Sequence, residues 1–600
     1  DPTIQQLIWD EIRTGFHLEN LSLEALAYVY ENTFVSTATR WVYDTHATPP
    51  QVAEFIVQKL PFESIGDPQQ RTVFEPFAGH APFLTAALGR LRTLLPFNAD
   101  ITARHEYLVR MLTGIELDSF AREVARYSLI LADYPNPNGW RIAEGNAFTS
   151  PQFARLLARS NIVLCNPPFG QFTSGERAQH PNLKATNKAV EALLRVLDRP
   201  PQMLGFVLPR SFTDGQIYKH ARKRLAETYA SISMTALPDS ALRFSEAETV
   251  VVIASDKTGI DRRWHRAFIS QDDYGRFWQT GRPTWEDSEH VEGPVGDDPQ
   301  IWTHPLTRNL RDHLRHFILL GQVAEIHRGL EYSDAVEAHV SDKPRQGYTR
   351  GLHHVDDGLE PYIVRGWRYL DTDPRTMRWK AYRHPWDRTK VIANAARISR
   401  GPWRIIAAVD TTGLVCYQSF HGIWPKGDVP AEVIAAVLNG PVANALLSAS
   451  GGVRHNFVRD LRAIPLPQLS QDEVESLRLL VQQYYTLAKE APPSARELSD
   501  VMVQIDTLVL SGYQLPGWLG GGLLDYIGTA ERPQLGSCLV DQLQKRHGSL
   551  VDKKFLDGLS EPESTELERI NRLLDAAEAS YYAPIKDALA RVGATPLERT

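Results

Sequence analysis

A short run of strand-forming residues, "NIVLC" at 161–165, is followed directly by Asn166, Pro167, Pro168 and Phe169. Proline fixes φ at about −65°, so the loop is stiff, and it offers the Asn166 side-chain oxygen and the Pro167 carbonyl as a rigid pair of acceptors. An exocyclic amino group carries two N–H donors and fits such a pair. Two acceptors pull the nitrogen lone pair out of the ring, and Phe169 is able to stack on the base. The loop therefore predicts chemistry on an exocyclic amine.

Three features upstream of this loop describe a nucleoside pocket. Glu75 ends the run "TVFEPF", and the small residues Ala78 and Gly79 after it let backbone N–H groups approach a ligand. Glu116 ends "LTGIEL", where an acidic residue can accept both hydroxyls of a ribose. Asn146 in "EGNAF" supplies an amide for an adenine edge. The sequence contains no GxGxxG fingerprint and no P-loop, so the set predicts S-adenosylmethionine rather than NAD or ATP.

These residues stand at the ends of apolar runs that alternate with helical stretches. The runs cover residues 72–77, 112–117, 161–166, 203–209 and 248–254. Between them, "FLTAALGRLRTLL", "SFAREVARYSLILA" and "GQIYKHARKRLAETY" carry apolar residues at helical spacing. The alternation predicts a mostly parallel α/β sheet, which binds ligands at the carboxyl ends of its strands.

Changes in composition and hydrophobic pattern along the sequence predict five parts. We expect an N-terminal helical segment at 1–40, a catalytic domain at 41–257, a polar linker or insertion at 258–320, a second α/β domain at 321–469 and a mainly helical region at 470–600. A chain of 600 residues is too long for a single core, which agrees with several domains.

Composition restricts the class of protein. The chain is 43% hydrophobic and 23% charged, and no apolar stretch approaches the roughly 18 residues of a membrane span. The start, "DPTIQQLIWDEI", is typical of a helix that opens on Asp-Pro rather than of a signal peptide. Three scattered cysteines without CxxC spacing and 19 histidines without HExxH predict a cytoplasmic protein with no disulfide framework, no metal site and no membrane partner.

The charge distribution says more than the net charge of −7. Residues 341–465 contain 18 Lys and Arg against 11 Asp and Glu, so a positive segment lies within an acidic chain. Such a segment is a candidate electrostatic footprint for nucleic acid, and a solvated face without a partner is the alternative.

Seven segments in this order resemble a known family: "HATPP", "EPFAGHAPFL", "GIELD", "GNAF", "NPPF", "FVLPRSF" and "LRFSEAETVVVI". They are similar to the gamma-class amino (N6-adenine) DNA methyltransferases over roughly residues 20–255. The resemblance implies a Rossmann-like S-adenosylmethionine-dependent methyltransferase sheet followed by a target-recognition domain. It also implies site-specific transfer of a methyl group to the N6 amine of a flipped adenine, within a restriction-modification or phage-defence system.

The resemblance assigns roles to individual residues. Thr48 and Pro49 belong to the segment that closes over the cofactor, and Phe244 takes the place of a second aromatic against the flipped adenine. The methionine end of the cofactor is assigned to Glu75, Ala78 and Gly79, its ribose to Glu116 and its adenine to Asn146. The sequence departs from the family's usual pattern at this last position, where Asn146 replaces an acidic residue and Ala147 an aromatic one. This departure puts cofactor affinity in doubt.

The segment 321–469 more loosely resembles the target-recognition domains fused to such enzymes, which implies double-stranded DNA as a partner. Basic side chains neutralise phosphates, and arginine reads base edges. The candidates here are Arg365, Arg368, Arg378, Arg383, Lys390 and Arg454, each of which has a solvated surface residue as its alternative. No PD…ExK nuclease or Walker A motif is apparent, so we expect nuclease or motor activity to reside in partner subunits. The helical tail either docks such a partner or packs on its own body.

Two rival functions stay open from the sequence. The first is methyl transfer to another planar nitrogen, in an RNA base or a protein glutamine, because such enzymes also use an Asn-Pro-Pro-aromatic loop. The second is a non-catalytic DNA-binding scaffold of a defence complex, which the substitutions at Asn146 and Ala147 favour.

Overall fold

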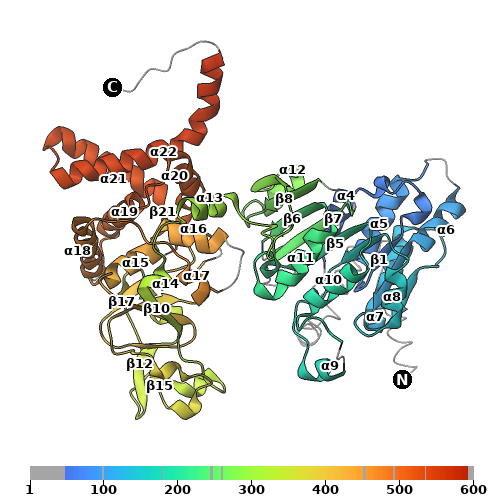
Figure 1. Cartoon of the computed structure of the whole chain (residues 1–600), viewed down its shortest axis with the longest axis horizontal. Helices are drawn as coiled ribbons and strands as arrows, with labels where there is room; N and C mark the ends of the chain where they lie inside the picture. Colours follow the sequence, from blue (N-terminus) through green and yellow to red (C-terminus); the bar gives the residue numbers. More distant parts are fainter. Residues whose placement is uncertain are drawn as a thin grey trace, which may run out of the picture. The chain divides into compact units, whose positions relative to one another are not determined.

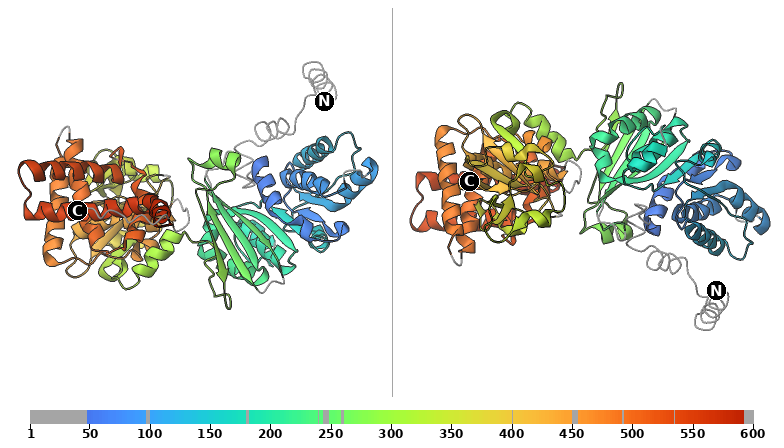
Figure 2. Two further views of the ribbon diagram at one scale, coloured as in Figure 1. Left: turned by 90° about the horizontal axis from the view of Figure 1, so that it is seen from above. Right: turned by 90° about the horizontal axis from the view of Figure 1, so that it is seen from below.

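The chain folds as two compact units, Asp1–Trp302 and Thr303–Thr600, each of which is described by itself. The structure is a computed structural model, drawn from three directions in Figure 1 and Figure 2. It describes residues 48–96, 100–179, 182–238, 240–242, 248–257, 261–399, 401–449, 455–490, 493–533 and 535–591. The expected helical segment 1–40 and the candidate residues Phe244 and Arg454 lie outside the described residues.

The first unit is built on a nine-stranded sheet in the order β3-β2-β1-β4-β5-β7-β6-β8-β9. Its strands are β1 (Val73–Glu75), β2 (Leu112–Glu116), β3 (Arg141–Glu144), β4 (Ile162–Cys165), β5 (Met203–Pro209), β6 (Ser231–Leu237), β7 (Thr249–Ser255), β8 (Arg262–Phe268) and β9 (Trp285–Val291). The five strands from β3 to β5 are parallel, whereas β7 runs antiparallel to both β5 and β6. This mixed, Rossmann-like α/β sheet confirms the fold class predicted from the sequence.

Helices cover both faces of this sheet (Figure 1). They are α4 (Pro50–Lys59), α5 (Pro82–Thr93), α6 (Ile101–Met111), α7 (Ser119–Ala132), α8 (Pro151–Leu157), α9 (Ser174–Gln179), α10 (Lys188–Asp198), α11 (Lys219–Thr228) and α12 (Tyr274–Thr280). Apolar residues of α4, α5, α6 and α7 form one core, and those of α8, α10 and α11 form a second core with alternate strand residues. A buried strand contributes to both cores because successive side chains point to opposite faces.

The stretch 258–320 was predicted to be a polar linker or insertion, and its described residues contain regular structure that a linker would lack. Strands β8 and β9 lie in this stretch and extend the sheet, β8 pairing in parallel with β6 and β9 antiparallel to β8. Arg266 explains how so polar a sequence enters a sheet, since its buried guanidinium pairs with Asp287 at 3.0 Å and with Glu289, and donates to the Ile301 carbonyl at 2.9 Å. Burial of a charge is tolerated when it is paired and hydrogen-bonded.

The described β part of the second unit consists of two four-stranded sheets, with strand orders β10-β19-β16-β17 and β11-β15-β12-β18, and two two-stranded sheets, β13-β14 and β20-β21. The strands are β10 (Ala324–Arg328), β11 (Val340–Ser341), β12 (Tyr348–Leu352), β13 (Leu359–Glu360), β14 (Ile363–Val364), β15 (Arg368–Asp371), β16 (Lys390–Asn394), β17 (Ala407–Asp410), β18 (Val415–Cys416), β19 (Phe420–Pro425), β20 (Glu531–Arg532) and β21 (Ser537–Cys538). Within the two four-stranded sheets, the described pairs are antiparallel except β12–β18.

The helices of the second unit share one core with the first of these sheets. They are α13 (Pro305–His313), α14 (Leu320–Val323), α15 (Ala431–Asn439), α16 (Pro441–Ala449), α17 (Val458–Arg462), α18 (Gln471–Ala488), α19 (Ala495–Ser511), α20 (Gly517–Leu523), α21 (Leu539–Leu556) and α22 (Glu561–Arg591). Ile423 of β19, Ile434 of α15, Leu477 of α18 and Leu508 of α19 are buried in that core. The predicted domains 321–469 and 470–600 therefore fold as parts of one unit.

Helix α15 is the element that joins the sheet to the helices. Eight of its residues, from Ala431 to Asn439, are buried, as expected for a helix that is apolar on all sides. In the part of the chain described, no single helix has the length and hydropathy of a membrane span, and only the bent pair α15 and α16 meets those limits together.

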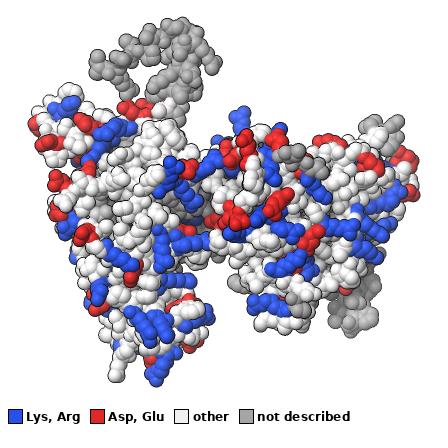
Figure 3. Space-filling model, viewed as in Figure 1, with Lys and Arg blue, Asp and Glu red and all other residues white. Residues whose placement is uncertain are grey.

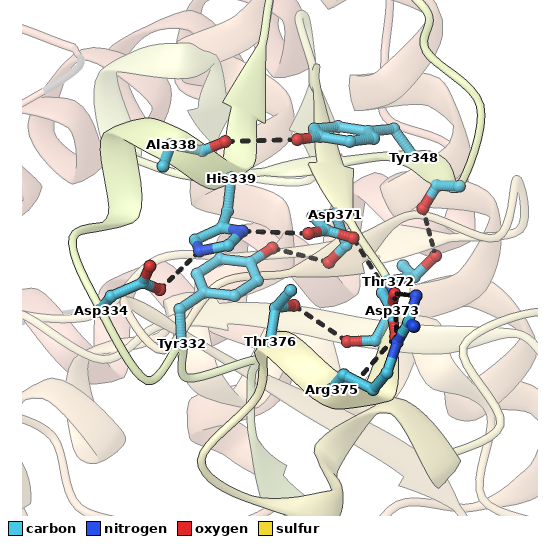
Figure 4. A network of polar contacts seen from close by, with 11 residues as sticks. Tyr332, Asp334, Ala338, His339, Tyr348, Asp371, Thr372, Asp373, Arg375 and Thr376 are labelled. Carbon is cyan, nitrogen blue, oxygen red and sulfur yellow. Dashed lines mark hydrogen bonds and ion pairs between the residues drawn. The ribbon is translucent and has the colours of Figure 1, made fainter.

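A polar network ties together the loops around the second sheet of this unit (Figure 4). His339 Nδ1 lies 2.9 Å from Asp371 and its Nε2 lies 2.6 Å from Asp334, while its ring stacks on Tyr332 at 4.4 Å. The Tyr332 hydroxyl donates to the Asp371 carbonyl at 2.8 Å. Burial lowers the pKa of His339, but the two carboxylates outweigh it, so the net pKa lies above its usual value. A protonated His339 thus cross-links the stretch that contains Asp334 to Asp371 of β15.

We predict that this cross-link makes stability depend on pH. The raised pKa of His339 means that its contribution is full below 6.5, the ordinary value, and is lost as pH rises through the folded-state pKa. His339→Gln should lower the free energy of unfolding by about 1–3 kcal/mol at pH ~6 and by less at pH ~9. Chemical denaturation at several pH values measures this, with the exposed His354→Gln as control. An equal loss at every pH would contradict the prediction.

Candidate active site

The carboxyl ends of three neighbouring strands bring the sequence-predicted residues to one edge of the sheet. Strand β1 lies between β2 and β4, and all three run parallel. Glu75 is the last residue of β1, Glu116 the last residue of β2, and Asn166 follows the last residue of β4. The predicted carboxylates and the catalytic amide are thus carried by adjacent strands at the same end of the sheet.

Glu75 is almost fully buried and is fixed by the helix that follows it. Its Oε2 accepts a hydrogen bond from the backbone N–H of Leu84, in the first turn of α5, at 3.1 Å. Burial raises the pKa of Glu75 well above its usual value, the N–H group lowers it, and the charge of Glu116 raises it further. A cation bound beside these carboxylates would relieve this penalty.

The loop between β1 and α5 turns back onto the end of β2. Gly79 has φ of +51°, and Ala81, at +65°, also adopts the left-handed conformation. The Ala78 N–H donates to the Ile115 carbonyl at 2.9 Å, and the Gly79 N–H donates to Glu116 Oε2 at 2.7 Å. The small residues predicted to line the cofactor therefore lie against the predicted ribose carboxylate.

Glu116 receives a backbone donor on each oxygen. Besides Gly79, the N–H of Asp118 donates to its Oε1 at 2.8 Å. Burial raises the pKa of Glu116, against the lowering effect of these N–H groups. A carboxylate oxygen has two acceptor sites, so hydroxyl groups of a ligand could be accepted beside the backbone donors.

Asn146 follows β3, next to β2. Its side-chain oxygen accepts the Phe148 N–H at 2.9 Å, and its carbonyl accepts the Ser150 N–H at 2.8 Å. The preceding Gly145 donates to the Glu116 carbonyl at 3.0 Å, which connects the two strand ends. The amide oxygen helps to shape the turn, so the contact predicted with an adenine edge is left to its second acceptor site and to the amide N–H donors.

Ala147, the second departure from the family pattern, is buried and leaves the aromatic contacts to its neighbours. Phe148 lies 5.1 Å from Phe77, which follows β1, and 4.9 Å from Phe172, which follows the catalytic loop. These rings join the three strand-end loops. The sequence reasoning missed them, although the Phe beside Glu75 in "EPFAG" and the Phe after Ala147 were visible signals.

Asn166 contacts the segment predicted to close over the cofactor. Its amide nitrogen donates to Thr48 Oγ1 at 2.9 Å, across 118 residues of sequence, and Pro49 then leads into α4. This hydrogen bond sets the orientation of the amide and turns its oxygen away from Thr48. That oxygen is shielded from solvent. A ligand amine would therefore reach it only after the atoms that cover it move away. Pro167 is buried, whereas Pro168 and Phe169 are partly exposed.

A hollow of about 350 Å³ in the first unit lies elsewhere. It is lined by residues of α8 and α10 and of the loop before α10, and none of the predicted site residues borders it. The candidate site is therefore assigned from the strand ends and their contacts rather than from this cavity.

The basic candidates of the second unit fall into two groups. Arg368 and Arg378 are exposed and pair with carboxylates, Arg368 with Asp357 at 2.9 Å and Arg378 with Glu331 at 2.7 Å. Arg383 is exposed and lies over the ring of Tyr382. Figure 3 shows Lys and Arg side chains gathered on the part of the second unit that carries β12 and β15. These three arginines have surface positions that a nucleic acid could contact.

Two other candidates have structural partners. Arg365 donates to the Ala488 carbonyl at 2.7 Å, at the end of α18, as well as pairing with Glu360. Lys390 was expected on the DNA-binding surface, and the structure corrects this, because its side chain is fully buried. Its ammonium lies 2.5 Å from Asp410 and 2.6 Å from the Trp386 carbonyl. The alternating pattern around Lys390 gave no sign that its partner lay 20 residues away.

The chain was compared with known proteins. No family model matches it, and no curated protein sequence matches it. Among solved structures, the type IIL restriction-modification enzyme MmeI bound to DNA aligns with 86% of this chain and 76% of its own, at 13% identity and a TM-score of 0.52. A DrdV–DNA complex aligns with 97% and 74%, at 10% identity and a TM-score of 0.53.

A third similar structure is a nuclease-deletion mutant of the type ISP restriction-modification enzyme LlaGI with a DNA substrate mimic. It aligns with 78% of this chain at 12% identity and a TM-score of 0.52, and this chain spans 48% of its length. The likeness is one of fold. It extends over both units, since each alignment covers more than three quarters of the chain.

We predict that Lys390 acts on stability. Lys390→Met leaves the Asp410 carboxylate buried without its cation and should cost about 3–5 kcal/mol of unfolding free energy. The surface change Arg378→Gln should alter stability by less than about 0.5 kcal/mol. Urea denaturation of both variants compares them, and a Lys390→Met protein as stable as the parent would show that the ion pair is not structural.

Proposed function

We propose that the chain is a site-specific DNA methyltransferase that transfers a methyl group from S-adenosylmethionine to the N6 amine of an adenine. The hydrogen bond between Asn166 and Thr48 carries the proposal, because it joins the loop predicted to hold the amine to the segment predicted to close over the cofactor. Glu75 and Glu116 stand on the two neighbouring strands at the same edge. The proposal is supported by the shared fold of restriction-modification enzymes solved with DNA.

The residues at the strand ends fit a cofactor that carries a positive charge, a ribose and an adenine. Two carboxylates with raised pKa values favour a cation, and bound S-adenosylmethionine would supply an activated methyl group at a sulfonium centre. Glu75 and the N–H groups of the Ala78–Gly79 loop would hold the methionine end, Glu116 the ribose hydroxyls and Asn146 the adenine. Thr48 and Pro49 would close this pocket.

Asn166 and Pro167 would act on the acceptor amine. Their two oxygens accept its two N–H donors and localise its lone pair on nitrogen, which removes the conjugation that makes an adenine amine a poor nucleophile. Phe169 would stack on the extruded base, a contact worth about 1–3 kcal/mol against the cost of unstacking. No covalent enzyme intermediate is needed, because positioning and polarisation supply the catalysis.

The second unit would hold double-stranded DNA. Its exposed arginines, Arg368, Arg378 and Arg383, would neutralise phosphates or read base edges, and Arg454 keeps the same role expected from the sequence. Phe244, which belongs to the first unit, keeps its expected role against the flipped adenine. In this proposal the chain is the modification component of a restriction-modification or phage-defence system, and nuclease or motor subunits are partners.

The first test of this function is methyl transfer to DNA. Asn166→Ala removes the amide acceptor and should lower labelled methyl uptake by about 10²–10³-fold or more, as loss of a positioned transition-state partner does. Asn161→Ala, five residues earlier in the chain, is the matched control, since among the described residues its side chain donates to the Gln70 carbonyl near the surface. Duplex DNA, RNA and protein should be offered as acceptors in parallel. Uptake into RNA or protein alone, or uptake indifferent to Asn166→Ala, would refute the assignment.

A second test concerns the carboxylates. Because burial raises the pKa of Glu75 and of Glu116, and a bound cation favours their ionised forms, affinity for S-adenosylmethionine should fall as pH decreases, beginning above 4.5. One coupled proton gives a change of up to about tenfold per pH unit. Glu75→Gln should weaken binding and reduce this slope, whereas Glu144→Gln on β3 should leave both unchanged. Calorimetric titration measures both quantities, and no binding by the parent chain would favour a scaffold.

A further inference from the structure

The chain leaves the sheet edge just after the catalytic loop and returns to it at Asn187. Between these points lies an arm that carries α9, visible in Figure 1. The neck of the arm is closed by backbone hydrogen bonds, from Phe172 to the Thr186 carbonyl at 2.8 Å and from Lys188 to the Gly170 carbonyl at 2.9 Å. Gln171 and Asn187 form an antiparallel bridge. The start of α10 is thus held against the end of the catalytic loop.

Asn187 uses both ends of its side chain at this neck. Its oxygen caps α10 by accepting the Val190 N–H at 3.1 Å, and its nitrogen donates to the Phe169 carbonyl at 2.7 Å. The residue is buried, and the Tyr218 hydroxyl lies 3.4 Å from the same oxygen. Burial raises the pKa of Tyr218, so its hydroxyl stays protonated and available as a donor.

Helix capping alone does not explain an amide at this position. Serine and aspartate cap helices about as well as asparagine, because capping requires only an acceptor. The contact with Phe169 requires a donor on the same side chain, which an ionised aspartate lacks and which serine could supply only from the single hydroxyl that also serves as the cap. An aspartate here would place a carboxylate oxygen against the carbonyl oxygen of Phe169.

The hydrogen bond from Asn187 to the Phe169 carbonyl restricts backbone dihedrals that the two prolines leave free. Proline fixes φ at positions 167 and 168, but ψ of Pro168 and both dihedrals of Phe169 remain free to rotate. Holding the Phe169 carbonyl fixes the orientation of the peptide group between Phe169 and Gly170. Thr48 holds the other end of the loop through Asn166, at 2.9 Å. The four catalytic-loop residues are therefore held between two long-range hydrogen bonds.

We propose that Asn187 is a positioning residue for methyl transfer. It acts through the Phe169 carbonyl to keep the Pro167 carbonyl and the Phe169 ring aligned for the acceptor amine. The consequence for catalysis rests on the proposed function, whereas the effect of Asn187 on the geometry of the catalytic loop does not.

Asn187→Asp tests the proposal because it retains the helix cap and loses the donor. It should lower kcat for methyl transfer by about 10–100-fold, as small misplacements of catalytic groups do, with KM for S-adenosylmethionine changed less than about twofold. The control is Asp100→Asn, which exchanges the capping residue of α6, where the side chain accepts the Ala103 N–H. That variant should retain the kcat of the parent protein.

Hydrogen exchange of the full chain separates this inference from the proposed function. In Asn187→Asp, amides of residues 169–172 should exchange faster, while those of α10 should keep their protection. An unchanged kcat or unchanged exchange in the loop would overturn the positioning role, as would loss of protection throughout α10. If the parent protein transfers no methyl group to DNA, the proposed function fails, and the exchange data alone decide whether Asn187 holds the loop.

Discussion

Parallel pairing of β1 with β2 and β4 is the constraint on which the site depends. Parallel strands present their carboxyl ends at one edge, so residues separated by up to 91 positions in sequence, Glu75 and Asn166, follow adjacent strands there. Backbone donors then hold the carboxylates, since Leu84 donates to Glu75 and Gly79 to Glu116. The sheet places the groups, and these short-range hydrogen bonds orient them. The raised pKa values of both glutamates follow from the same burial that makes their positions well defined.

Buried charges shape the rest of the architecture. Arg266 lies inside an extension of the first sheet, and Lys390 lies inside the second unit. In the second unit, Arg532 also pairs with the buried Asp506 at 2.7 Å. Each of these ions would be costly alone, and each has a charged partner. Arg266 and Lys390 also donate to backbone carbonyls, whereas Arg532 lies over the ring of Trp403. This arrangement lets segments with a polar sequence enter the interior, so polarity in this chain is a poor guide to exposure.

The hydrophobic pattern of the sequence could predict the strands that contain apolar runs. β1, β2, β4, β5 and β7 coincide with predicted runs, and the candidate residues at their ends were placed correctly on the strand ends by sequence. β8 and β9 could not be predicted this way, because Arg266 is neutralised by partners on β9 that only the fold brings near. Lys390 was misassigned for the same reason. The contact between Asn187 and Phe169 was also invisible, since it depends on the length of an arm whose closure no local pattern specifies.

The surface arginines of the second unit differ from these buried cations, because their own side chains remain exposed. The guanidinium groups of Arg368 and Arg378 are exposed, although the side chains of their partners Asp357 and Glu331 are only 8% and 18% exposed. Turning such an arginine to a DNA phosphate would release carboxylates, whereas Arg365 would also have to release the Ala488 carbonyl. If the second unit binds DNA as proposed, its reading surface should be built from exposed arginines such as Arg368 and Arg378. The buried cations, Lys390 above all, would then hold that surface in shape without contacting the nucleic acid.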